Sequence, residues 1–277
     1  MNKLDEREAP ARVNAVGPAA ASASGSQGPT GTPDEREASR QVQQMFSRIA
    51  PRYDLLNRLL SFSMDGAWRR RTASRVADVL ERADARVLDL CCGTGDLAFA
   101  LERRARRGMR GAGARVYGTD FSVPMLVRAR EKGQQERARV AEGFVGSDAL
   151  ALPFGEGTFD LVTAAFGFRN LSNYQKGLRE IGRVLRDGGK IAILEFSEPQ
   201  KGIAAAGFRF YFRHILPRVG GAISGSSRAY TYLPASVEKF PAPEVLAEWM
   251  REAGFGEVEY VMWNFGSVAL HTGVKRP

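Results

Sequence analysis

A glycine-rich turn between an apolar run and a helix constrains the fold of this chain more than any other feature. The run at 86–90 predicts a buried strand, and Gly93 and Gly95 let the backbone turn sharply and approach a ligand closely. The residues after the turn predict a helix. This order of strand, turn and helix indicates the ligand-binding edge of an α/β sheet.

The carboxylates around the turn discriminate between ligands. Gly93, Gly95 and Ala98 fit the dinucleotide pattern G-x-G-x-x-G/A, so an NAD-binding oxidoreductase is one interpretation. A pyrophosphate, however, prefers bare amide donors at a helix N-terminus, and Asp89 and Asp96 would repel it. The same carboxylates would attract a small cation. S-adenosylmethionine carries an ammonium and a sulfonium group, so we expect it to bind at Asp89, Gly93 and Gly95.

Strands and helices alternate along most of the chain. This alternation predicts an α/β, Rossmann-like, doubly wound and mostly parallel seven-stranded sheet, with N-terminal helices and a helical or loop insertion before the last two strands. Strands are expected at 86–90, 115–119, 141–147, 159–166, 190–196, 258–263 and 267–273, and helices at 68–83, 97–107, 123–132, 171–185 and 243–253.

The chain is expected to form one domain preceded by a tail. Residues 1–38 are rich in Ala, Gly, Ser and Pro and have almost no large apolar side chains, so they predict a disordered tail. Residues 39–277 then form the folded domain. Within it, 39–83 is interpreted as a helical cap or lid and 200–240 as an insertion on the substrate side.

Charge and composition limit the partners and the location. The net charge of +9 is compatible with a solvated basic surface, with attraction to anionic lipid headgroups, or with nucleic-acid binding. Arginines cluster at 68–71 and 103–107, which lack interleaved aromatics and any nucleic-acid motif, so a solvated surface is favoured. No apolar run reaches membrane-spanning length and no signal peptide is recognised. We therefore expect a cytoplasmic protein, at most peripheral to the inner face of the cell membrane.

Two further positions after strands suggest contacts to a nucleoside. Asp120, after the second strand, is expected to accept hydrogen bonds from both ribose hydroxyls, although it could instead cap the following helix. After the third strand, Asp148 and Ala149 would present an acceptor and a backbone N–H to the adenine edge. Leu150 and Leu152 would pack on the adenine face.

Several segments together resemble a known family over residues 42–274. The turn and the segments after the next two strands look like the motifs of class I methyltransferases. Further segments are similar to the menaquinone/ubiquinone biosynthesis C-methyltransferases. These segments are residues 45–57, 166–170, 183–189, 194–197, 230–234 and 240–241.

The resemblance implies a reaction and a set of cofactor contacts. It implies methyl transfer from S-adenosylmethionine to a ring carbon of a prenylated quinol, converting demethylmenaquinol to menaquinol; a ubiquinone-precursor benzoquinol is the alternative acceptor. By motif alignment, Thr94, Asp120, Asp148 and Ala149 contact the cofactor. Some members carry Ser where this chain has Ala165, so only a backbone contact is expected there.

Three residues are candidates for the chemistry. Arg169 and Asn170 are expected to face the cavity. A guanidinium stays protonated, so Arg169 would stabilise a developing phenolate rather than act as a base, and Asn170 would orient a water or a ring oxygen. A salt bridge that fixes the loop is the alternative role for Arg169. Tyr53, with Asp54, is interpreted as a lid over the methionine end of the cofactor or as a helix staple.

The remaining residue types exclude some chemistry. His214 and His271 are far apart and lack the spacing of a metal site, so no metal is expected. The adjacent Cys91 and Cys92 cannot staple the fold and are expected to lie buried under the turn. Whether the chain forms a homodimer is left open.

An aromatic and basic segment has three interpretations. Its aromatic side chains could form a groove for an isoprenoid tail, they could be ordinary packing, or the segment could be a helix at the membrane edge. The residues are Phe208, Phe210, Tyr211 and Phe212, next to Arg209 and Arg213.

Overall fold

The computed structural model describes residues 35–50, 53–54, 61, 63–108, 113–199, 207 and 235–277. Several predictions fall outside these residues. They are the tail up to residue 34, the aromatic segment 208–212, His214, the segment 230–234 and most of the predicted insertion.

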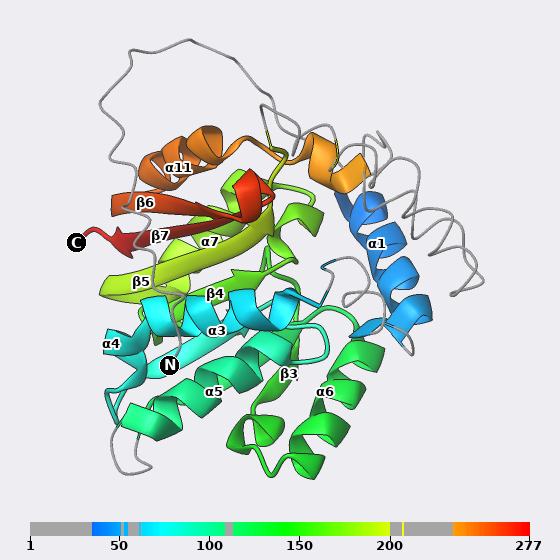
Figure 1. Ribbon diagram of the computed structural model, residues 1–277, viewed down its shortest axis with the longest axis vertical. Helices are drawn as coiled ribbons and strands as arrows, with labels where there is room; N and C mark the ends of the chain where they lie inside the picture. Colours follow the sequence, from blue (N-terminus) through cyan, green and yellow to red (C-terminus); the bar gives the residue numbers. More distant parts are fainter. Residues whose placement is uncertain are drawn as a thin grey trace.

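The described helices and strands follow the predicted alternation (Figure 1). The helices are α1 (Glu35–Ile49), α3 (Asp65–Arg75), α4 (Ala77–Leu80), α5 (Asp96–Gly108), α6 (Val123–Gln135), α7 (Tyr174–Val184) and α11 (Pro243–Glu252). The strands are β1 (Arg86–Leu90), β2 (Arg115–Asp120), β3 (Phe144–Gly146), β4 (Phe159–Ala165), β5 (Leu185–Phe196), β6 (Phe255–Trp263) and β7 (Val268–Lys275), with 3-10 turns η2 (Arg139–Glu142), η3 (Phe168–Asn170) and η5 (Asn264–Gly266).

The described strands form one mostly parallel sheet. It has seven strands in the order β3-β2-β1-β4-β5-β7-β6, and β7 runs antiparallel to both of its neighbours. β1 lies between β2 and β4, so the chain reverses its direction of winding beside β1, where doubly wound sheets bind ligands. The predicted fold class is confirmed.

Successive residues of the central strands pack into two separate cores. In β1, Val87 packs with α3, α4, α5 and α6 on one face, whereas Leu88 packs with α7 and α11 on the other. Leu161 and Val162 of β4 divide in the same way. Because side chains alternate across a strand, an apolar run buried on both faces gives this three-layered arrangement.

Several predicted boundaries differ from the structure; β5, for example, begins at Leu185, five residues before the predicted start. The third strand is only Phe144–Gly146, because η2 occupies the residues before it. The helix expected at 68–83 begins earlier and is divided, since Val76, with φ −110° and ψ 20°, separates α3 from α4. α1 begins at Glu35, inside the segment predicted as a tail.

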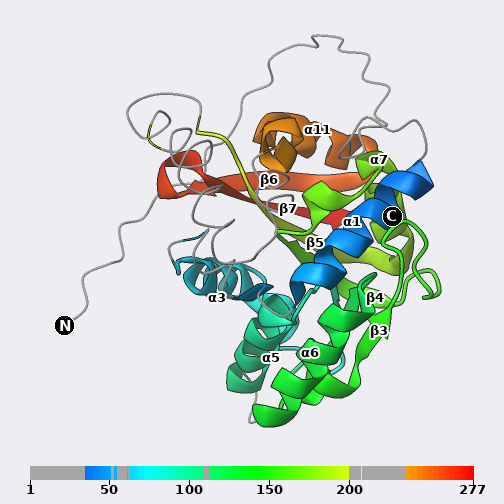
Figure 2. The ribbon, with the colours of Figure 1, turned by 90° about the vertical axis from the view of Figure 1, so that its right-hand side faces the viewer.

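The carboxyl ends of the parallel strands meet at one edge of the sheet, and α1 lies across this edge. Figure 2, which views the molecule from that side, shows α1 running in front of the sheet beside α6. The chain thereby brings an N-terminal helix over the end of β2, the position where a doubly wound sheet holds its ligand. No described helix is both long and apolar enough to cross a membrane.

Candidate active site

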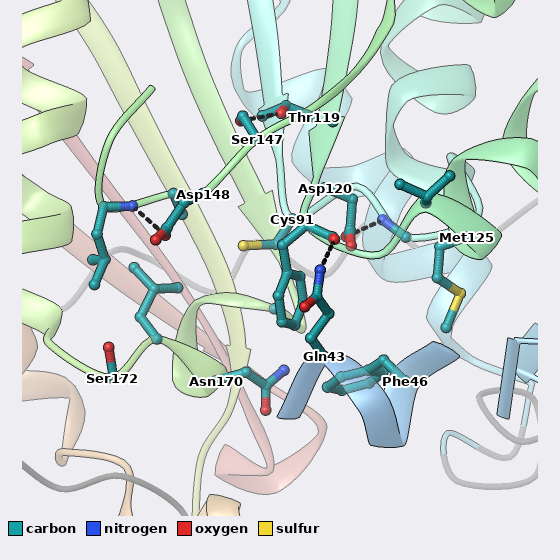
Figure 3. Close-up of a pocket in the computed structure, with 18 of the residues that line it drawn as sticks. Gln43, Phe46, Cys91, Thr119, Asp120, Met125, Ser147, Asp148, Asn170 and Ser172 are labelled. Atoms are coloured by element: carbon teal, nitrogen blue, oxygen red, sulfur yellow. Dashed lines mark hydrogen bonds between the residues drawn. The ribbon is translucent and has the colours of Figure 1, made fainter. Parts of the chain in front are cut away.

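A cavity of about 720 Å³ opens at the carboxyl edge of the sheet. Loops after β1, β2, β3 and β4 line it, and α1 closes one side. In the view of Figure 3, Asp120 and Asp148 lie on opposite sides of Cys91, with Asn170 and Ser172 along a further wall. The residues that line it and are used below are Gln43, Phe46, Tyr53, Cys91, Gly93, Asp120, Asp148, Ala149, Leu150, Phe166, Gly167, Asn170 and Leu171.

The glycine turn brings the backbone to the cavity. Gly95 has φ +85°, and a Cβ there would lie 2.9 Å from the ring atoms of Phe99 and of Phe144, so only glycine fits. Cys91 also adopts a positive φ, of 53°. The expectation that Cys91 lies buried under the turn is wrong, because it is half-buried and lines the cavity.

Asp120 connects the end of β2 to the turn. Its Oδ2 accepts a hydrogen bond from the Gly93 N–H at 2.9 Å, and its Oδ1 accepts one from the Ser122 N–H at 2.8 Å. The alternative role as a helix cap is wrong, because Ser122 is the N-cap residue of α6. Asp120 is only 6% exposed, and burial raises its pKa to about 6 despite these N–H donors. It lines the cavity as predicted.

Asp89 lies under the turn and is 1% exposed, so it does not itself line the cavity. Thr163 donates to its Oδ1 at 2.9 Å, whereas its buried Oδ2 makes no hydrogen bond of ordinary geometry to a described residue. Burial raises the pKa of Asp89 to about 7, and Thr163, Arg69 and the Ala98 N–H offset this only in part. A buried acceptor without a donor fits a ligand that supplies a cation or an N–H group.

The segment after β3, predicted to contact adenine, borders the cavity in part. Asp148, Ala149 and Leu150 line the cavity, and the Leu150 N–H donates to Asp148 Oδ1 at 2.9 Å. Leu152 does not line it, so its contact with the adenine face stays a prediction. Its side chain packs in the core against α7, and its N–H donates to Glu180 at 2.7 Å. Both carboxyl and backbone groups at 148–150 thus border the cavity at the end of β3.

Tyr53 and Asp54 lie beside the glycine turn. Tyr53 lines the cavity, and a Cβ on Gly93 would lie 3.4 Å from its ring. Asp54 accepts a hydrogen bond from Thr94 Oγ1 at 2.6 Å. Thr94 is buried and is not among the residues lining the cavity, so its contact with the cofactor stays a prediction. The hydroxyl fixes Asp54.

Asn170 and Arg169, expected to act together, point to different places. Asn170 lines the cavity. Arg169 is 7% exposed and donates to Glu195 at 2.9 Å and to Ser236 at 3.3 Å, while its guanidinium stacks on Phe196. The prediction that Arg169 faces the cavity is therefore wrong, and its alternative role as a salt bridge is confirmed. A buried carboxylate requires such a partner.

The end of β4 also differs from the prediction. Ala165 does not line the cavity, and the next two residues, Phe166 and Gly167, do. Phe166 has a positive φ of 58°, which turns the chain out of the strand. A Cβ on Gly167 would lie 2.4 Å from Cys91 Cβ, so a glycine is required there. The backbone contact predicted at Ala165 stays untested, and Phe166 and Gly167 are the residues at the end of β4 that border the cavity.

Two expectations about charge are also wrong. Asp96 does not offer a free carboxylate to a ligand, because Lys132 donates to it and Arg69 lies 3.7 Å away. Arg69 itself was expected at the surface with the cluster at 68–71, but it is buried and paired with Asp65. Of the two carboxylates beside the turn, Asp96 is therefore neutralised by its cationic partners, whereas Asp89, beneath the turn, can still take up or release a proton.

Sequence reasoning predicted a helical cap over 39–83 but did not single out the residues of α1 that line the cavity. Gln43 and Phe46 line the cavity; Gln43 donates to the Phe121 carbonyl at 2.6 Å, and the Phe46 ring packs edge-on against Phe121 and Tyr53. The helical periodicity around Phe46 indicates an apolar face but not what it faces. No described group of three His, Cys, Asp or Glu side chains is arranged to hold a metal ion.

The cavity has the buried carboxylate of Asp120 and the exposed one of Asp148 on its walls and the buried Asp89 beneath the glycine turn, beside apolar walls at the ligand edge of a doubly wound sheet. This arrangement suits a cationic nucleoside. The chain is similar to a solved structure from Thermotoga maritima, described as a SAM-dependent methyltransferase, with a TM-score of 0.56 and 16% identity over 84% of this chain and 99% of that one. At this identity the likeness shows the shared fold. Fold and site together define the class of S-adenosylmethionine-dependent methyltransferases.

Sequence comparison identifies the family. The profile of the ubiE/COQ5 methyltransferase family matches residues 34–275, so the chain belongs to this family. It is 52% identical to the demethylmenaquinone methyltransferase of Thermus thermophilus, over 83% of this chain and 99% of that protein. It is 45% identical to the demethylmenaquinone methyltransferase of Deinococcus radiodurans, over 88% of this chain and 96% of that protein. The predicted family is confirmed, and it replaces the NAD-binding alternative.

Proposed function

We propose that this protein transfers the methyl group of S-adenosylmethionine to a ring carbon of demethylmenaquinol and so produces menaquinol. The observation that carries this proposal is the 52% identity to the Thermus thermophilus enzyme, which extends over 99% of that protein. A family profile that matches nearly the whole described domain supports the same reaction type.

Three parts of the cavity suit three parts of the cofactor. Asp120 accepts hydrogen bonds from the ribose hydroxyls, since each carboxylate oxygen has a second acceptor position beyond its backbone partner. Asp148 and Ala149 bind the adenine edge, and Leu150 packs on the adenine face. The charge of Asp89 attracts the ammonium group from beneath the turn.

The cofactor supplies an electrophilic methyl group, and the chain positions the acceptor. Carbon methylation requires an electron-rich ring carbon aligned with that methyl group, so alignment and exclusion of water account for much of the rate. Asn170 and Tyr53 line the cavity near the turn and are the candidates for contact with a quinol oxygen. An amide N–H of Asn170 directed at that oxygen would stabilise negative charge as it develops.

The test is methyl transfer by the purified protein. With methyl-labelled S-adenosylmethionine and a short-chain demethylmenaquinol, we expect label in the quinol ring; a ubiquinone-precursor benzoquinol serves as the competing acceptor. Asn170→Ala should lower turnover and leave cofactor affinity near that of wild type. Label only in the benzoquinol would assign the alternative acceptor, and no transfer to either quinol would refute the proposal.

We also propose that the protein contacts the membrane surface, since a prenylated quinol resides there. Support comes from η5, which follows β6 at the same sheet edge as the cavity: Phe265 is 88% exposed. Exposed Arg70 and Arg71 lie on nearby α3, with Arg71 stacked on Trp263. An apolar tip beside cations suits a surface of anionic lipid.

Sedimentation with anionic vesicles tests this membrane contact. We expect Phe265→Ser to bind the vesicles more weakly than wild type does, and equal binding by the two proteins would contradict the proposal. A homodimer and a cytoplasmic location stay predictions.

A further inference from the structure

Asp54 joins two elements that border the cavity. Its Oδ1 accepts a hydrogen bond from Thr94 Oγ1, in the glycine turn, at 2.6 Å. Its Oδ2 accepts one from Lys132 Nζ, on α6, at 3.0 Å. Lys132 also donates to Asp96 in the first turn of α5. A carboxylate from the segment before α3 is thus held by the turn after β1 and by the helix after β2.

The contacts continue into the interior of the protein. Arg69 of α3 lies 3.7 Å from Asp96 and pairs with Asp65. Its guanidinium stacks on Phe166, a wall of the cavity, at 5.6 Å from the ring centre. Because Arg69 is buried and held on both sides by carboxylates, it gives Asp96 a fixed position. Lys132 therefore joins Asp54 to a rigid part of the domain.

The residue that this arrangement positions is Tyr53. Its ring lies against Gly93, lines the cavity and packs edge-on against Phe46 of α1. Asp54 adjoins Tyr53 in the chain, so an anchored Asp54 limits where the Tyr53 ring can lie. Burial acts to lower the pKa of Lys132, but the carboxylates of Asp96 and Asp54 outweigh this effect and raise the pKa above its usual value. The ion pair therefore persists across the neutral pH range.

We propose that Lys132 and Asp54 are positioning residues: their ion pair holds Tyr53 over the methionine end of bound S-adenosylmethionine and slows its release. The inference rests on the proposed cofactor site and goes beyond it, since neither Lys132 nor Asp54 is among the residues that line the cavity. Release of the cofactor requires Tyr53 to move from Gly93, and the ion pair opposes that movement.

The test compares cofactor release in Lys132→Met and wild type. Methionine keeps the side-chain length and loses the charge, and Asp96 keeps Arg69 as a partner. Labelled S-adenosylmethionine is bound to the full chain and chased with unlabelled cofactor. We expect release to be about 5- to 30-fold faster, the range for a charge-assisted hydrogen bond reduced by partial exposure. Lys132→Arg should restore slow release, because a guanidinium can bridge two carboxylates.

Two controls separate positioning from general damage. Lys190→Met removes a surface ion pair with Asp78, 2.6 Å long, and should leave release unchanged. In a Tyr53→Ala background, Lys132→Met should have little further effect, because the ring that the ion pair positions is gone. A wild-type release rate in Lys132→Met, or effects of Tyr53→Ala and Lys132→Met that simply multiply, would overturn the inference. A chain that binds S-adenosylmethionine but methylates no quinol would refute the proposed reaction and leave this inference standing.

Discussion

Replacing Asp120 by Asn tests the assignment of the ribose site. Each carboxylate oxygen accepts one backbone N–H, from Gly93 at 2.9 Å and from Ser122 at 2.8 Å. An amide offers only one oxygen. Whichever way the Asn side chain is placed, its NH2 group faces a backbone donor, and the charge that favours the ribose hydroxyls is lost.

The effects on affinity and on stability should differ in size. Exchanging charge-assisted bonds to the ribose for neutral ones costs about 1.5–3 kcal/mol, which weakens cofactor binding about 10- to 150-fold. The unmatched donor also destabilises the fold. However, burial raises the pKa of Asp120 to about 6, so removing the buried charge relieves a desolvation penalty and offsets part of that loss. Affinity should therefore fall far more than stability.

Asp160 provides the matched control. It is a buried carboxylate at the opposite end of the sheet, where it accepts the Arg86 N–H at 2.8 Å and pairs with Arg82 and Arg186. Calorimetric titration of S-adenosylmethionine should give weaker binding for Asp120→Asn, and the wild-type dissociation constant for Asp160→Asn. Unchanged binding by a folded Asp120→Asn variant, or an equal loss in both variants, would refute the assignment.

Three further predictions follow from buried groups. Because burial raises the pKa of Asp89 to about 7 and a bound cation favours its ionised form, cofactor affinity should fall as the pH drops below about 7. In Asp89→Asn, titration from pH 8 to 6 should show a clearly smaller fall, since the titration of Asp120, with a pKa of about 6, remains; a fall as large as that of wild type would exclude Asp89. Gly167→Ala should lower the free energy of unfolding by about 1–3 kcal/mol, because its methyl group overlaps Cys91, and an unchanged urea midpoint would contradict the contact. Arg169→Ala should cost about 3–5 kcal/mol of stability by leaving Glu195 buried without its partner, whereas full stability with lost turnover would return Arg169 to a catalytic role.

The fold could be predicted because its signals are local. β1 spans the predicted residues 86–90, since a run buried on both faces consists of consecutive apolar side chains around a single Asp89. Asp120 and Asp148 could be found because they lie at or just past the end of a strand, and parallel strands end at one edge of the sheet. The third strand was less accurate, because β3 has only three residues, too few for a periodic pattern to define.

Side-chain direction in the site could not be predicted in the same way. Arg169 and Asn170 are adjacent in the chain, yet one pairs with Glu195 and the other lines the cavity. The partner that decides this belongs to a different strand, so no local pattern shows it. Gln43 presents the same difficulty: an amphipathic helix indicates one apolar face, but packing decides whether that face meets a core or a cavity.

Methyl transfer by the purified full-length chain tests the central claim most directly. After incubation with methyl-labelled S-adenosylmethionine and demethylmenaquinol, mass spectrometry of the extracted quinol should show one labelled methyl group on the ring, with Asp120→Asn requiring far more cofactor to reach the same rate. Binding of NAD instead of S-adenosylmethionine, or an unlabelled quinol in the presence of bound cofactor, would contradict it.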